Sequence, residues 1–144
     1  MITVLILTGI LAATAASYWP GEGINLSAQT EQLAGDLRYL QSMAVTHGQR
    51  TRINFAADRY WFSDIDNTAR LPHPMAALND VILDTGITLA SSNAFLVFDS
   101  DGVPYTNAVL PGNALGSDAV ITLSAAGTTR TLRISPQTGR VLLQ

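Results

Sequence analysis

An acidic segment in the middle of the chain has side chains that a calcium site would use. Asp99, Asp101 and Gly102 have the spacing of the start of a calcium-binding loop, in which carboxylate oxygens at fixed intervals bind the ion. Val103 and Pro104 occupy the next positions, and no glutamate follows to complete the ligand set. The segment therefore predicts a tight turn and not a metal site.

The two histidines are the other candidates for binding a metal. His47 falls at the expected end of a helix, and His73 lies between two prolines far along the chain. A metal site needs more ligands than this pair, and the sequence contains no cysteine to supply them. We interpret both as surface histidines, and the lack of cysteine excludes disulfides and thiolate chemistry.

No combination of residues in the sequence predicts catalysis. Ser124 and Ser135 fall in strand and turn contexts and lack the glycine-flanked pattern of a nucleophile elbow. No glycine-rich loop has the spacing that would hold a phosphate. The sequence predicts a protein that is not an enzyme, with no cofactor, no metal and no small-molecule substrate.

The charged residues argue against a nucleic acid as the main partner. All eight basic residues are arginines, and eleven acidic residues give a net charge of -3. There is no overall positive field to attract nucleic acid or anionic lipid. Arg130, Arg133 and Arg140 fall on neighbouring expected strands, so weak contact with phosphate groups remains the alternative.

A helix is predicted in front of the β-rich part of the chain. Pro20, Gly21 and Gly23 predict a break, Asn25 or Ser27 could then cap the helix, and it should end near Gly48. Apolar residues at helical spacing form its inner face: Leu26, Leu33, Leu37, Leu40 and Ala44, with Met43 beside them. Polar residues are expected mostly on the other side: Gln29, Glu31, Asp36 and Arg38.

After Gly48 the apolar pattern changes to alternation, which is typical of strands. The expected strands cover residues 50–55, 60–63, 81–83, 87–89, 95–98, 119–123, 129–134 and 140–143. The first two should form a hairpin, and the last three an antiparallel meander. The segments between them, 64–79 and 104–118, are predicted to be loops that determine which partners the protein contacts. Within the hairpin, one of Trp61 and Phe62 should be buried and the other exposed.

The first nineteen residues contain no charged side chain and are apolar all round. At about 1.5 Å per residue, such a helix spans roughly the 30 Å hydrocarbon core of a membrane. The segment predicts a membrane anchor, and a cleaved signal peptide or a buried core element are the alternatives. The residues expected to anchor the protein and to act in assembly are Ile2, Leu5, Ile6, Leu7, Ile10, Leu11 and Pro20.

An apolar N-terminal helix, a proline break, an amphipathic helix and an antiparallel sheet follow one another in type IV pilins and type II secretion pseudopilins. The stretch "LRYLQSMAVTHG" (Leu37–Gly48) with "QRTRINF" after it, the turn "DSDGVP" (Asp99–Pro104) and the tail "TLRISPQTGRV" (Thr131–Val141) resemble the GspH/FimT family of minor pseudopilins. The resemblance implies an α+β, pilin-like fold with a long N-terminal helix packed on an antiparallel sheet.

The sequence departs from the family at its start. Family members have a basic leader, a glycine cut site and an "FTLIE" run whose glutamate helps subunits to dock, and none of these is present. If "MITVLIL" follows directly on that run, the processing motif lies upstream of Met1, which we expect. Aligning Pro20 with the helix-breaking proline of the family would instead place Thr3 near the position of the glutamate. We do not expect prepilin peptidase to process the chain as written.

The resemblance implies a division into an apolar helix (1–19), an amphipathic helix (20–48) and a periplasmic head (49–144). It implies a minor subunit that is held by inner-membrane lipid before assembly and then contacts other pilin subunits at the fibre tip, in protein secretion or pilus initiation. DNA-binding relatives resemble one another in a "GRxR" motif, of which only Gly139 and Arg140 are present, since Leu142 replaces the second arginine. A DNA-binding pilin or a secreted binding module are the alternative functions.

Overall fold

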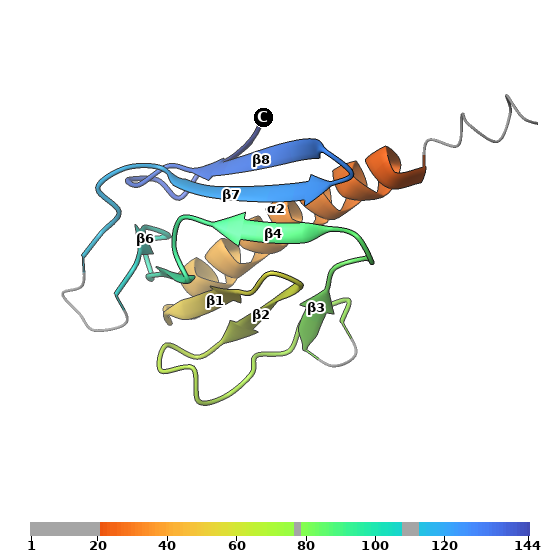
Figure 1. The fold of residues 1–144 in the computed structure, drawn as a ribbon. Helices are drawn as coiled ribbons and strands as arrows, with labels where there is room; N and C mark the ends of the chain where they lie inside the picture. The colour runs from red at the N-terminus through yellow and green to blue at the C-terminus, as the bar shows by residue number, and fades with distance from the viewer. Residues whose placement is uncertain (1–20, 77–78, 108–112) are drawn as a thin grey trace, which may run out of the picture.

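The computed structural model describes residues 21–76, 79–107 and 113–144, in which one long helix lies behind two antiparallel sheets (Figure 1). The helix is α2 (Gly21–His47). The strands are β1 (Thr51–Phe55), β2 (Arg59–Ser63), β3 (Asp80–Ile82), β4 (Thr88–Ser91), β5 (Phe95–Phe98), β6 (Pro104–Tyr105), β7 (Ala119–Ala125), β8 (Thr128–Ile134) and β9 (Val141–Leu143). The first sheet has the order β3-β2-β1-β5-β6 and the second β4-β7-β8-β9. The α+β, pilin-like architecture expected from the sequence is confirmed.

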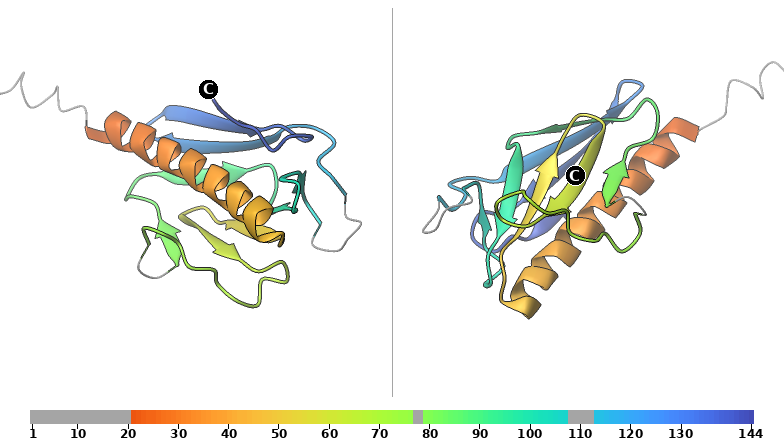
Figure 2. Two further views of the ribbon diagram at one scale, coloured as in Figure 1. Left: turned by 180° about the vertical axis from the view of Figure 1, so that it is seen from behind. Right: turned by 90° about the horizontal axis from the view of Figure 1, so that it is seen from below.

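The apolar face of α2 forms the centre of the core. The residues predicted for this face, Leu26, Leu33, Leu37, Leu40 and Ala44, are all 0% exposed. They pack on strands of both sheets, which α2 crosses diagonally (Figure 2, left). This one face therefore joins the two sheets into a single core, and the burial of each leucine stabilises the fold by about 1.5–3 kcal/mol.

The start of α2 differs from the prediction. The helix runs from Gly21 through Gly23, so Asn25 and Ser27 lie inside it and do not cap it. Glycine lowers helix stability by only about 1 kcal/mol, and the buried face that begins at Leu26 outweighs that cost. The end agrees with the prediction, because Gly48 has a φ of 61° and Gln49 N–H donates to Ala44 O at 3.2 Å.

The strands fall into two sheets where the sequence predicted one. The β1–β2 hairpin is confirmed, with Ile53 paired to Phe62, and β5 pairs with the other side of β1. Beyond β3 the chain turns at residues 84–87, where Ile87 N–H donates to Asp84 O, and then enters the second sheet as β4. The predicted meander is confirmed as β7-β8-β9, and a short strand, β6, lies in the segment predicted to be a loop.

The side chain of Gln41 links the helix to a turn from each sheet. Its Nε2 donates to Gly102 O and to Thr138 O, both at 2.8 Å. Gly102 and Gly139 have φ values of 78° and 64°, and both lie against Gln41. The turn "DSDGVP" and the tail "SPQTGRV", which are distant in sequence, are therefore held at one point on α2.

Candidate functional site

Three polar side chains from different elements meet in the core beside α2. Tyr60 Oη, on β2, donates to Asp36 Oδ2 on α2 at 2.5 Å. His73, from the segment between β2 and β3, places Nε2 2.9 Å from the same carboxylate oxygen. The side chain of His73 is fully buried and that of Asp36 is 9% exposed. We call these three residues the Asp36 cluster.

The ring of His73 is fixed on both sides. Its Nδ1 accepts the backbone N–H groups of Met75 (3.1 Å) and Ala76 (3.0 Å), so the ring proton lies on Nε2, facing Asp36. The Nε2–Oδ2 distance of that contact is short, but its direction is not that of a good hydrogen bond. The interpretation of His73 as a surface residue was therefore wrong, whereas His47 is exposed as expected.

The burial of Asp36 also contradicts the prediction that it faces away from the core. A signal for this was present, since Asp36 lies three residues after Leu33 and four before Leu40, which places it on the apolar face. No residue of this cluster was predicted as a site. A buried carboxylate needs partners, and here they attach the 64–79 segment to the helix. The cluster therefore positions the described residues after β2, up to Ala76, against the helix.

Tyr60 predicts how stability depends on alkaline pH. Burial, with the adjacent Asp36 carboxylate, raises the pKa of Tyr60 far above its ordinary value. The folded state keeps the phenol protonated while the unfolded chain releases its proton above about pH 10, so stability is complete below that pH and falls above it. We expect the free energy of unfolding to fall by up to about 1.4 kcal/mol per pH unit there. Urea unfolding at pH 8 and pH 11 measures this, and Tyr60→Phe should reduce the dependence.

The three arginines proposed for weak DNA contact do not form one patch. Arg130 and Arg133 lie three positions apart on β8, so their side chains leave opposite faces of the sheet. Arg133 lies 3.5 Å from Asp118, which neutralises it. Arg140 lines a groove together with Arg38, a residue that the sequence analysis placed only on the polar side of the helix.

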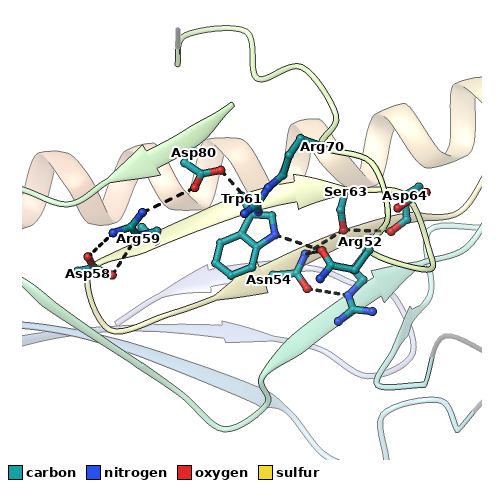
Figure 3. Close-up of polar contacts among 10 residues, drawn as sticks. Arg52, Asn54, Asp58, Arg59, Trp61, Ser63, Asp64, Arg70 and Asp80 are labelled. Carbon is teal, nitrogen blue, oxygen red and sulfur yellow. Dashed lines mark hydrogen bonds and ion pairs between the residues drawn. The ribbon is translucent and has the colours of Figure 1, made fainter. Parts of the chain in front are cut away.

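The face of the first sheet that points away from α2 carries an internal polar network (Figure 3). Arg70 lies over the Trp61 ring at 4.1 Å, and Asp80 lies between Arg59 (3.9 Å) and Arg70 (3.5 Å). Asn54 accepts from Arg52 Nε at 2.7 Å. Arg59 and Arg70 are already paired with Asp80, and Trp61 packs against Arg70 within the hairpin region. Of Trp61 and Phe62, Phe62 is the buried residue.

The acidic turn at 99–102 forms as predicted. Asp99 Oδ1 accepts the backbone N–H groups of Asp101 (3.0 Å) and Val103 (2.8 Å), which is the bonding of an Asx turn. Among the described residues, no group of three or more acidic or histidine side chains is placed to hold a metal ion. The carboxylate of Asp99 therefore stabilises the turn.

The predicted anchor residues, Ile2 to Leu11 and Pro20, lie outside the described residues. Within residues 21–76, 79–107 and 113–144, no helix is both long enough and apolar enough to cross a membrane. The division at residue 20 and the anchoring role remain predictions.

Comparison with known proteins gives a family match and several similar folds. The model of the family "Type II transport protein GspH" matches residues 29–138. Two crystal structures of the type IV minor pilin FimU of Pseudomonas aeruginosa (strain PAO1) are similar, with sequence identities of 19% and 20% and TM-scores of 0.58 and 0.57. Each alignment covers 83% of this chain, and they cover 87% and 92% of the FimU chains, respectively. The minor pseudopilin EpsH from the Type 2 Secretion System of Vibrio cholerae has 13% identity and a TM-score of 0.63, with 83% and 96% covered. No curated protein sequence matches the chain.

Proposed function

The chain belongs to the family of the type II transport protein GspH, and from this premise we propose that it is a minor subunit that initiates a secretion pseudopilus or type IV pilus. Members of this family are structural subunits and not enzymes. We place the protein in the inner membrane before assembly, with its head in the periplasm, and at the fibre tip afterwards. Its partners are other pilin or pseudopilin subunits.

The observation that carries this proposal is the family match over residues 29–138, together with the position of α2. α2 begins at Gly21, directly after twenty residues without a charge. The rest of α2 is held in the head by its apolar face. A subunit of this type has one end that enters an apolar environment and another that presents a folded surface.

The apolar segment would serve two environments in turn. Before assembly, lipid chains surround it, and during assembly it packs among the corresponding helices of other subunits. Lipid chains and apolar side chains have similar polarity, so the transfer is close to neutral in free energy. A small external input, such as that of an assembly motor, can therefore move the subunit from the membrane into the fibre.

A charge in the apolar segment tests the proposal. Ile6→Asp introduces a carboxylate whose insertion into the membrane costs about 3 kcal/mol near the centre of a helix. We expect this variant to be lost both from the membrane fraction and from sheared fibres, while Ile6→Leu behaves as wild type. Immunoblots of the two fractions measure this, and normal incorporation of Ile6→Asp into fibres would contradict the proposal.

A further inference from the structure

Strand β9 has an open edge beside a groove. It is the last strand in the order β4-β7-β8-β9, and in Figure 1 the C-terminal end lies beyond β8. Thr131 and Gln144 exchange both backbone hydrogen bonds (3.2 and 2.8 Å), and Ser135 N–H donates to Arg140 O at 3.0 Å. Because such bonds alternate along an antiparallel pair, Val141 and Leu143 direct their backbone groups away from β8.

The groove beside this edge combines apolar and basic side chains. It has a volume of about 540 Å³ and lies between α2 and β9. Its lining residues are Arg38, Gln41, Thr138, Arg140, Val141, Leu142 and Leu143, which we call the edge groove. Leu142 and Leu143 are 39% and 43% exposed. Arg38 Nη2 donates to Val141 O at 3.3 Å, a long bond that covers one acceptor of the edge.

The charges of the edge groove are not balanced within the described part of the chain. Arg59, Arg70 and Arg133 each lie within 4.0 Å of a carboxylate, whereas Arg38 and Arg140 do not. An adjoining pocket is lined by Glu31 together with Arg130. Two arginines therefore face the open edge of a protein whose net charge is -3.

We propose that the edge groove binds an extended acidic segment of another protein, which adds to the second sheet as a fifth strand. Its backbone would pair with the N–H of Val141 and with the N–H and C=O of Leu143, since Val141 O already accepts from Arg38. Its carboxylates would bind Arg38 and Arg140. Backbone pairing supplies affinity in strand addition, and side-chain pockets supply specificity. This interaction goes beyond the proposed function and does not require that the chain enter a fibre.

The charges and the edge favour this occupant over two others. A second copy of the chain would bring the arginines of both copies together, which disfavours pairing of β9 with β9. A nucleic acid could bind the arginines but has no peptide groups to pair with Val141 and Leu143, and it would leave Leu142 exposed. An acidic peptide strand satisfies the backbone, the charge and the apolar surface together.

The test uses the full chain in detergent micelles and a fluorescent hexapeptide of alternating valine and glutamate. We expect saturable binding by fluorescence anisotropy, and about tenfold weaker binding of the same peptide with glutamine in place of glutamate. Arg38→Gln and Arg140→Gln should each weaken binding to a similar degree. Arg59→Gln is the matched control, because Arg59 lies in the first sheet and is already paired with Asp58, and its affinity should equal that of wild type.

A second variant tests the backbone pairing itself. Leu143→Pro removes an N–H that points away from β8, so the meander keeps its bonds while the outward donor is lost. We expect this variant to fold, as checked by circular dichroism, and to lose the peptide. Three results would overturn the proposal: no saturable binding to wild type, unchanged binding to folded Leu143→Pro, or displacement of the peptide by an oligothymidylate whose own binding is unaffected by Leu143→Pro.

Discussion

Asp36→Ala should lower the free energy of unfolding by about 3–5 kcal/mol, because it removes one partner from a buried charged contact and leaves the others unpaired. Tyr60 Oη and His73 Nε2 both face the Asp36 carboxylate, and neither has access to water that could replace it. A domain of this size has a total stability of about 5–15 kcal/mol, so the loss is a large fraction. Urea unfolding of the detergent-solubilised protein, followed by circular dichroism, measures it.

Two further variants separate the cluster from a general effect of removing an acid. Glu31→Ala removes an exposed carboxylate from the same helix, and we expect its effect to stay within about 0.5 kcal/mol. In a Tyr60→Phe background, Asp36→Ala should cost less than in wild type, because one of the groups left unpaired is already absent. Equal costs in both backgrounds would show that Asp36 and Tyr60 are not coupled.

Asp36→Ala should also release the described residues that follow β2 from their attachment to the helix. The backbone N–H groups of Met75 and Ala76 are held by the His73 ring, and the ring is held by Asp36. When Asp36 is lost, we expect the hydrogen-exchange rates of these two amides to increase. The increase should be larger than at the amide of Ile53, in the centre of the first sheet. Exchange rates that change equally at all three positions would indicate global destabilisation only.

The sequence was sufficient to predict the elements with a strong period. The leucines of α2 recur at helical spacing and are all buried, and the alternation predicted for 50–55, 119–123 and 129–134 corresponds to β1, β7 and β8. These predictions succeeded because the pattern and the packing depend on neighbours within the same element. The start of α2 was wrong for the opposite reason, since packing further along the helix outweighs the local effect of Gly21 and Gly23.

The candidate sites were less predictable, because each depends on residues that are distant in sequence. The spacing of Asp36 places it on the apolar face of the helix, but nothing near Asp36 in the sequence indicates that Tyr60 and His73 are its partners. Similarly, Arg140 was grouped with Arg130 and Arg133 by its neighbouring strands, but the fold places it beside Arg38 on the helix. The division into two sheets has the same origin, since it depends on which strands β4 pairs with.

Gly139→Ala should lower the free energy of unfolding by about 3 kcal/mol, through strain and through loss of the Gln41 bonds. Gly139 has a φ of 64°, which disfavours a side chain. A β-carbon at this position would also lie 2.5 Å from Gly102 O and would collide with Gln41 Nε2. Gly102 O is a backbone atom, so the whole turn must move, and both hydrogen bonds of Gln41 are then lost.

Gly127→Ala is the matched control for this prediction. Gly127 has a φ of 80°, but a β-carbon there would meet no atom within 4 Å, so the substitution introduces backbone strain alone, at about 1 kcal/mol. The difference between the two variants in urea unfolding measures the contact with Gln41 and Gly102. In a Gln41→Ala background this difference should shrink, because the bonds that Gly139→Ala breaks are already absent. If both glycine variants lower the free energy of unfolding equally, Gln41 does not join the two turns to the helix.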